Sequence, residues 1–326
     1  MSACPCGTQR SAGLTVRCSR TPLLKRAAGG TMPDSKLPPS LDLRSALTEF
    51  ATITTTQTHE HIKPLHRYLA LRLAIEGGFH PDEIRPHPPL AVTRSSKHCL
   101  LHFDRASETE QERSVLGGLK SKAVDVVVAK EGVGPVLAIS VKGTIGAFRN
   151  LTNRMEEAAG DATNIHIMYP GLVYGFLHLL KGSDARKVKL KPNDAAIMAS
   201  GEVLSSIRRY HDVLLGLTGR KFIRDEGSRY EAVAVGMVDP HDNCGTLHQS
   251  FPDTQSPLHF AMFFPTLLAA YDLRYPYVAV SVAGLKRLAW ATDSPALVSL
   301  RGSGGYRNLL GYEPRECEEE SAEDRS

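Results

Sequence analysis

The 326-residue sequence has no long hydrophobic run. A membrane-spanning helix needs about 18 or more consecutive apolar residues. One of the longest apolar stretches here, residues 258–270, is interrupted by His259 and Pro265. We therefore expect no membrane insertion.

Cysteine pairs and glycine-rich phosphate loops are also absent. None of the six cysteines forms a Cys-x-x-Cys pair, which argues against a zinc site and a disulfide framework and favours a reducing cytoplasm. The glycine pairs at 117–118 and 304–305 are not followed by Gly-Lys-Ser/Thr, so neither is a nucleotide-binding loop. We interpret His59, His61 and His66 as polar residues at a helix entry.

Charge divides the chain into three parts. Residues 1–40 carry six bases and one acid, residues 313–326 carry seven acids and two bases, and the body is mildly basic. Residues 1–31 lack the apolar core of a secretory signal; they are either a transit peptide or an extension upstream of a start at Met32. We predict a disordered or mis-assigned extension over 1–40, one domain over 41–312 and a disordered acidic tail over 313–326.

Hydrophobic periodicity predicts an α/β fold with one central mixed sheet flanked by helices. Helices are expected over 59–77, 148–159, 173–181, 193–217 (with Asn193 as its N-cap) and 256–273. Strands are expected over 98–103, 123–129, 135–142, 164–169, 230–238 and 278–282. Turn residues 131–134 join two of these strands into a hairpin.

This hairpin carries the residues with the clearest chemistry. Asp125 lies in the first apolar strand, and Ser140 and Lys142 lie two residues apart in the second. A charge in an apolar strand is costly unless it is paired or metal-bound. Carboxylates suit Mg²⁺, and a neighbouring lysine can stabilise charge on a phosphate and help to activate water. The pattern therefore indicates metal-dependent phosphodiester hydrolysis.

These residues resemble the PD-(D/E)XK nuclease superfamily, and within it the type II restriction endonucleases that recognise sites centred on CCGG. That branch also has Ser-x-Lys, followed after thirteen residues by a helical glutamate; here the same spacing separates Lys142 from Glu156. The resemblance covers about residues 55–180. It implies a restriction-endonuclease-like core there, with an α/β elaboration over about 190–312.

The resemblance also implies roles for individual residues. Asp125 and Glu156 would bind Mg²⁺, Lys142 would activate water and Ser140 would organise the water shell of the metal. Glu60 is the nearest counterpart of a further helical metal ligand. Arg149 is what remains of the base-reading cluster of the branch, and Arg149, Asn153 and Arg154 are candidate DNA contacts.

The implied protein is a type II restriction endonuclease that cuts double-stranded DNA to leave 5′-phosphates. Its implied partners are a second copy of the chain in a homodimer and a cognate DNA methyltransferase. Two alternatives stay open: a defence or repair nuclease without sequence specificity, and a DNA-binding protein on the same fold that has lost catalysis.

Overall fold

The structure is a computed structural model that describes residues 37–38, 41–54, 60–94, 98–145, 151–190, 194–275 and 283–317. These residues belong to one unit, Ser35–Ser326. No helix among them is both long enough and apolar enough to cross a membrane. The predicted strand 278–282, the N-cap Asn193 and the DNA contact Arg149 lie outside the described residues.

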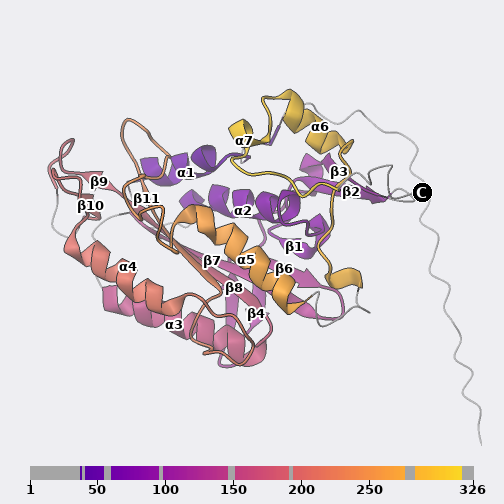
Figure 1. Ribbon diagram of the computed structural model, residues 1–326, viewed down its shortest axis with the longest axis horizontal. Helices are drawn as coiled ribbons and strands as arrows, with labels where there is room; N and C mark the ends of the chain where they lie inside the picture. Colours follow the sequence, from indigo (N-terminus) through magenta and orange to yellow (C-terminus); the bar gives the residue numbers. More distant parts are fainter. Residues whose placement is uncertain are drawn as a thin grey trace, which may run out of the picture. The chain divides into compact units, whose positions relative to one another are not determined.

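A five-stranded sheet forms the centre of this unit (Figure 1), in the order β1-β6-β7-β8-β11. The first three strands are antiparallel neighbours, whereas β7, β8 and β11 run parallel. The predicted α/β fold with a central mixed sheet is therefore confirmed. The strands are β1 (Ile84–Arg85), β6 (Val126–Lys130), β7 (Gly134–Thr144), β8 (Val173–Lys181) and β11 (Ala232–Val238).

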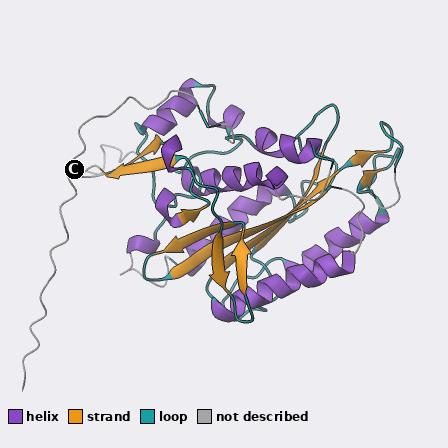
Figure 2. Cartoon of the chain, turned by 180° about the vertical axis from the view of Figure 1, so that it is seen from behind, coloured by secondary structure: helices purple, strands orange, loops and turns teal. Residues whose placement is uncertain are grey.

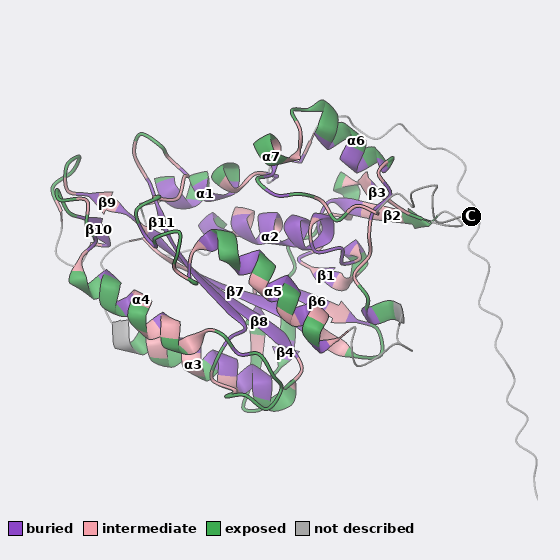
Figure 3. Ribbon diagram, in the orientation of Figure 1, coloured by how far each residue is buried: buried purple, intermediate pink, exposed green. Residues whose placement is uncertain are grey.

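Helices cover both faces of the sheet (Figure 2), because its strands alternate between two buried clusters. One face packs against α1 (Leu43–Thr52), α2 (Lys63–Ile75) and α5 (Phe260–Arg274). The other face packs against α3 (Leu151–Met168) and α4 (Ser205–Leu217). Helix α2 is apolar around most of its circumference, which is why it is almost entirely buried (Figure 3).

Shorter elements surround the sheet. Three two-stranded sheets are formed by β2 (Leu90–Arg94) with β3 (Cys99–Phe103), β4 (Arg113–Leu116) with β5 (Ser121–Val124), and β9 (Ser183–Asp184) with β10 (Ala196–Ile197). The short helices are α6 (Pro295–Gly302), α7 (Tyr306–Leu309), and the 3₁₀ turns Glu60–Ile62, Pro81–Glu83, Arg105–Ser107 and Ala283–Leu285.

The predicted hairpin of strands 123–129 and 135–142, the helix over 59–77 and the strand over 230–238 are confirmed. The two predictions for residues 164–169 and 173–181 are wrong. Of the predicted strand 164–169, residues 164–168 continue α3, since Gly160 faces open space and the buried positions Ala158, Ala162 and Ile165 keep the helical spacing. Residues 173–181 form the strand β8 instead of a helix. A central strand buried on both faces has a continuous apolar run, which periodicity alone does not distinguish from a buried helix.

Only the second half of the predicted helix 193–217 is helical. Its first half contains β10 and a turn in which Gly201 has φ +87°, a conformation that ends helical geometry and that glycine adopts without strain. Helix α4 begins after this turn, at Ser205. The expected helix 256–273 is present as α5, which begins at Phe260 with the His259 side chain as its N-cap.

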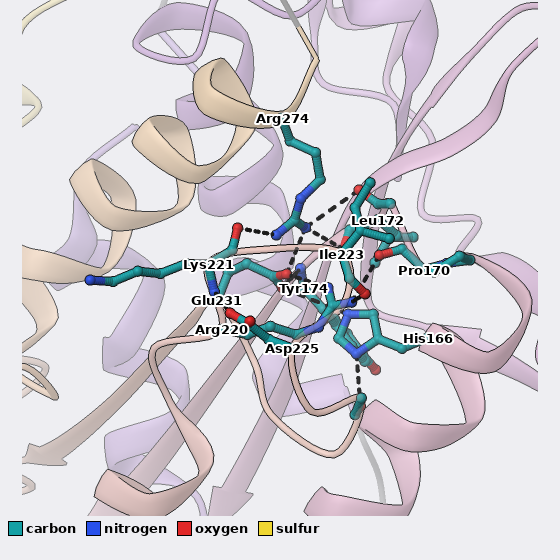
Figure 4. A network of polar contacts seen from close by, with 12 residues as sticks. His166, Pro170, Leu172, Tyr174, Arg220, Lys221, Ile223, Asp225, Glu231 and Arg274 are labelled. Carbon is teal, nitrogen blue, oxygen red and sulfur yellow. Dashed lines mark hydrogen bonds and ion pairs between the residues drawn. The ribbon is translucent and has the colours of Figure 1, made fainter. Parts of the chain in front are cut away.

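A buried network of ion pairs around Glu231 connects the second half of the chain to the sheet (Figure 4). Glu231 is 1% exposed, and its Oε1 accepts hydrogen bonds from Arg220 Nη1 at 2.8 Å and Arg274 Nη1 at 2.6 Å. Its Oε2 accepts the backbone N–H of Tyr174. Burial raises the pKa of Glu231, but His166, Arg274 and the Tyr174 N–H outweigh burial and lower the pKa below its usual value. Glu231 is therefore a structural carboxylate.

Candidate active site

Asp125 interrupts what the sequence predicts as one strand over 123–129. Strand β5 ends at Val124 and β6 begins at Val126. Between them the Asp125 Oδ2 atom accepts a 2.7 Å hydrogen bond from the backbone N–H of Val141 on β7. In a continuous strand ladder a backbone carbonyl would accept this N–H, and here the Asp125 carboxylate accepts it instead. The hydrogen bond fixes the carboxylate at the point where the chain passes from β5 into the central sheet.

A cavity of about 830 Å³ opens beside this carboxylate. Segments that are far apart in the sequence line it: His61 and His66 at the start of α2, Asp125, Lys142 on β7, and two side chains of α3. Helices α2 and α3 pack on opposite faces of the sheet, so the cavity lies where both faces meet the ends of β5 and β7. Cavities of this size accommodate small ligands or one group of a polymer.

Three potential metal ligands meet at one side of the cavity. His66, Glu112 and Asp125 each offer an atom, and these atoms lie within 4.8 Å of one another. His66 Nε2 is 3.7 Å from Asp125 Oδ1, and His66 Nδ1 is 3.6 Å from Glu112 Oε1. Two carboxylates and an imidazole are common ligands of divalent cations. Their chemistry and spacing fit such an ion.

The other side of the cavity is cationic. Lys142 Nζ lies 3.1 Å from Glu157 Oε1, and Arg154 donates from Nη1 to Glu157 Oε2 at 2.9 Å. Partial burial raises the pKa of Glu157, but the Lys142 and Arg154 charges outweigh burial and lower it. Glu157 is therefore ionised at neutral pH and holds the Lys142 ammonium at the cavity wall.

A neutral histidine lies behind the two cations. His178 is buried, and its ring nitrogens hydrogen-bond to Thr144 Oγ1, at 2.9 Å, and to the Tyr210 hydroxyl. Burial, together with the nearby charges of Arg154 and Lys142, lowers the pKa of His178 to about 3. His178 therefore adds no positive charge to the cavity at neutral pH.

The β4–β5 hairpin presents Glu112, which directly precedes β4. Helix α3 holds the hairpin through Asn164, whose Oδ1 accepts the N–H groups of Leu119 at 2.8 Å and Lys120 at 3.1 Å. Asn164 Nδ2 donates to the Lys120 carbonyl at 2.9 Å. Gly117 permits this approach, because a Cβ there would lie 2.2 Å from the Asn164 amide. The position of Glu112 thus depends on a contact made by α3.

Lys122 adds a second contact between the hairpin and α3, through an ion pair with Asp161. Burial and the positive charge of Lys142 lower the pKa of Lys122 to about 8. Asp161 lies on α3 and Lys122 on β5, so this ion pair links the hairpin to the helix that also carries Arg154 and Glu157.

Replacement of Asn164 by alanine is expected to loosen the β4–β5 hairpin. The change leaves two backbone N–H groups and one carbonyl without their hydrogen-bond partner, which lowers local stability by about 1–3 kcal/mol. Amide hydrogen exchange at Leu119 and Lys120 should accelerate by roughly ten- to a hundredfold, while exchange in α5 stays unchanged. Asn308→Ala, which removes one bond from an exposed amide, is the control. Unchanged exchange at Leu119 would contradict the proposed contact.

The structure places the sequence-predicted residues unequally. Asp125, Lys142 and Arg154 line the cavity. Ser140 does not: it is fully buried, and its hydroxyl hydrogen-bonds to Tyr174 at 2.8 Å. Asn153 and Glu156 are exposed on α3 and are not among the described residues that line the cavity.

Glu60, the expected helical metal ligand, is not brought to Asp125 either. It is exposed and pairs with Lys63 at 2.7 Å. The side chain that faces Asp125 from this part of the chain is His66.

Sequence reasoning missed His66, Glu112 and Glu157. A signal for His66 was present, because it is a polar residue inside the apolar helix α2, where a buried position needs a partner. Glu112 lay in a charged segment expected to be a loop, and nothing in its local pattern distinguishes it from neighbouring acids. Glu157 adjoins Glu156, and only the rotational phase of α3 separates them.

No protein family, curated protein or solved structure matches this chain. The residues and the geometry of the cavity are therefore the basis for assigning a function.

Proposed function

We propose that this protein is a metal-dependent deoxyribonuclease that hydrolyses phosphodiester bonds of double-stranded DNA, and specifically a type II restriction endonuclease. The observation that carries the proposal is that one cavity is lined by two kinds of side chain. Potential metal ligands, including Asp125, and the cations Lys142 and Arg154 line the same cavity. Phosphodiester hydrolysis needs both, since the reacting phosphate is anionic and gains charge in the transition state.

The chain's own residues then have distinct tasks. Asp125 is fixed by the Val141 N–H and offers its second oxygen to the cavity. Lys142 faces the phosphate, stabilises the charge that develops on it and helps to remove a proton from the attacking water. Arg154 contacts the DNA backbone. A bound divalent cation, Mg²⁺ by the resemblance, would polarise the phosphate and favour loss of that proton.

The reaction balances without another reactant. Water forms a new bond to phosphorus, the bond from phosphorus to the 3′ oxygen breaks, and that oxygen takes up a proton. The products carry a 5′-phosphate and a 3′-hydroxyl. Ser140 takes no direct part, because its hydroxyl is hydrogen-bonded to that of Tyr174 inside the protein. This contact stabilises β7, the strand that carries Lys142.

The order of elements around the cavity adds support at the level of the fold. Helix α2 is followed in the chain by the antiparallel central strands β1, β6 and β7, then by helix α3 and the parallel strand β8, and the short strands β2 to β5 lie between β1 and β6. The resemblance drawn from the sequence implies helix, strands and helix in this region. A symmetric homodimer remains part of the proposal, since cutting both strands of a palindrome requires two related sites, and a cognate methyltransferase would protect the host DNA.

Incubation of the purified chain with a large plasmid and a divalent cation distinguishes the proposal from its alternatives. Discrete fragments indicate site-specific cleavage, and a smear indicates a nuclease without sequence specificity. Intact DNA that is nevertheless bound in a mobility-shift assay indicates a DNA-binding protein. We expect discrete fragments.

The adjacent glutamates of α3 give a matched pair of variants. Glu157→Gln removes the carboxylate that holds Lys142, and loss of a charge-assisted contact of about 1.5–3 kcal/mol should slow single-turnover cleavage by roughly ten- to a hundredfold. Glu156→Gln changes an exposed side chain outside the cavity and should retain the wild-type rate within about twofold. DNA affinity without catalysis, measured by anisotropy, should be similar for both.

The reverse result is also informative. If Glu156→Gln is the slow enzyme and Glu157→Gln is not, the metal-binding role implied for Glu156 by the family spacing holds, and the role assigned to Glu157 is wrong.

A further inference from the structure

An imidazole lies among the potential metal ligands of the cavity. His66 comes from α2, Glu112 from the segment before β4, and Asp125 from the junction of β5 and β6. Segments so distant in the sequence have no local reason to place two acids and a histidine within 4.8 Å. Two carboxylates this close also repel each other unless a positive charge lies between or beside them.

The burial of His66 is an independent observation that points to a ligand. The residue is 4% exposed, and its Nε2 atom is buried with no hydrogen-bond partner in the part of the chain that the structure describes. A buried polar atom without a partner costs about 1–3 kcal/mol, so such atoms need an explanation. Nε2 lies 3.7 Å from Asp125 Oδ1, which is too long for a hydrogen bond but suitable for two ligands of one ion.

We propose that His66, Glu112 and Asp125 bind a divalent first-row transition ion of the Mn²⁺ type in preference to Mg²⁺. Carboxylates bind both classes of cation, but an imidazole nitrogen adds affinity for transition ions and little for Mg²⁺, which prefers oxygen ligands and retains several waters. This ion would be the cofactor of the proposed nuclease site, and the use of the ion in catalysis rests on that proposed function.

The spacing of the three groups suits one ion. Metal–ligand bonds of about 2.1 Å place opposite ligands about 4.2 Å apart and adjacent ones closer. The three ligand atoms, which lie within 4.8 Å of one another, are therefore near the separations that one ion requires. Three protein ligands would leave such an ion free to bind water or a phosphate oxygen.

The alternative explanation is a metal-free cluster in which a protonated His66 bridges the two carboxylates. Direct metal binding separates the two explanations. The full chain is stripped with EDTA, Mn²⁺ binding is followed by the loss of the free-ion EPR signal, and Mg²⁺ affinity is obtained by competition. Pulsed EPR on the bound Mn²⁺ then shows whether a nitrogen is coordinated, a measurement that needs no variant.

We expect Mn²⁺ to bind at least about tenfold more tightly than Mg²⁺ and to show nitrogen coupling. His66→Gln replaces the nitrogen with an amide and should lower Mn²⁺ affinity by about tenfold or more, while Mg²⁺ affinity changes by less than about threefold. His102→Gln is the control, because His102 lies on β3, hydrogen-bonds to Thr93 and is not among the described residues that line the cavity; its Mn²⁺ affinity should stay within about threefold of the wild-type value.

Bound Mn²⁺ without nitrogen coupling, equal affinity for Mn²⁺ and Mg²⁺, or an unchanged Mn²⁺ affinity in folded His66→Gln would each overturn the inference. A plasmid assay on the same samples separates it from the proposed function. His66-dependent Mn²⁺ binding with intact DNA supports the metal site and contradicts the nuclease. Cleavage with no histidine ligand supports the nuclease and contradicts the metal preference.

Discussion

Lys142→Ala is expected to reduce DNA cleavage by about three orders of magnitude while DNA binding stays nearly unchanged. The Lys142 ammonium is held beside the cavity by Glu157 at 3.1 Å, and it is assigned to the charge that develops on the phosphate. Loss of one such group typically costs about a hundred- to a thousandfold in rate, and loss of a proton-transfer group costs a similar factor. Removal of one cation among many changes binding little.

The measurement is single-turnover cleavage at saturating enzyme, with DNA binding followed by anisotropy in EDTA. Lys120→Ala is the control, because its side chain is exposed on the turn of the β4–β5 hairpin, near the site but outside the cavity lining. Cleavage by Lys142→Ala at a rate close to that of the wild type would show that the cationic half of the cavity is not catalytic.

The largest expected effect on stability is that of Glu231→Gln. This change leaves Arg220 and Arg274, both buried, without their shared carboxylate. Removal of one partner of a buried ion pair costs about 3–5 kcal/mol, since the remaining charge stays desolvated. The melting temperature should fall by about 10 °C, because a loss of 1 kcal/mol lowers it by roughly 2–4 °C in a domain of this size.

Glu226→Gln provides the comparison. Glu226 pairs with Arg229 at 3.1 Å, but both side chains are exposed, so the change should lower the melting temperature by at most about 2 °C. Thermal unfolding of the two variants at pH 7 is the measurement. A shift for Glu231→Gln as small as that for Glu226→Gln would show that the network in Figure 4 does not stabilise the fold.

The stabilisation from Glu231 also has a predictable pH dependence. The pKa of Glu231 in the folded chain lies below its usual value. The contribution is therefore complete above the unfolded value of about 4.3 and declines as the pH falls through the lower folded value. Thermal unfolding between pH 3 and pH 7 should show the difference between wild type and Glu231→Gln shrinking at the acidic end.

Local sequence pattern predicted the part of the fold that carries Asp125 and Lys142. Two β-branched apolar runs separated by a glycine-rich turn form a hairpin for reasons contained in those residues. The wrong strand and helix predictions over 164–181 have a different cause, because the structure of this segment is decided by tertiary burial. The identity of β8 depends on its burial between β7 and β11, which the sequence of that segment does not contain.

The candidate site was predictable in part for the same reason. Asp125 directly precedes β6 and Lys142 lies on β7, and a short turn joins these two strands, so their proximity follows from the hairpin. His66 and Glu112 reach the site only through tertiary packing, the first by burial of α2 and the second by the contact of the β4–β5 hairpin with Asn164. The spacing of thirteen residues leads to Glu156, whereas the glutamate of α3 that lines the cavity and pairs with Lys142 is Glu157; adjacent helical residues point about 100° apart.

Metal depletion and restoration tests whether a cation held by Asp125 is required for DNA cleavage. Wild-type protein and Asp125→Asn, which keeps an oxygen that can accept the Val141 N–H, are treated with EDTA and assayed on plasmid DNA before and after addition of Mg²⁺ or Mn²⁺. We expect depleted wild-type protein to be inactive, added cation to restore cleavage to fragments with 5′-phosphates, and equally folded Asp125→Asn to stay inactive with either cation. Cleavage by the wild type in EDTA, or full cleavage by Asp125→Asn, would contradict a metal-dependent nuclease built on Asp125.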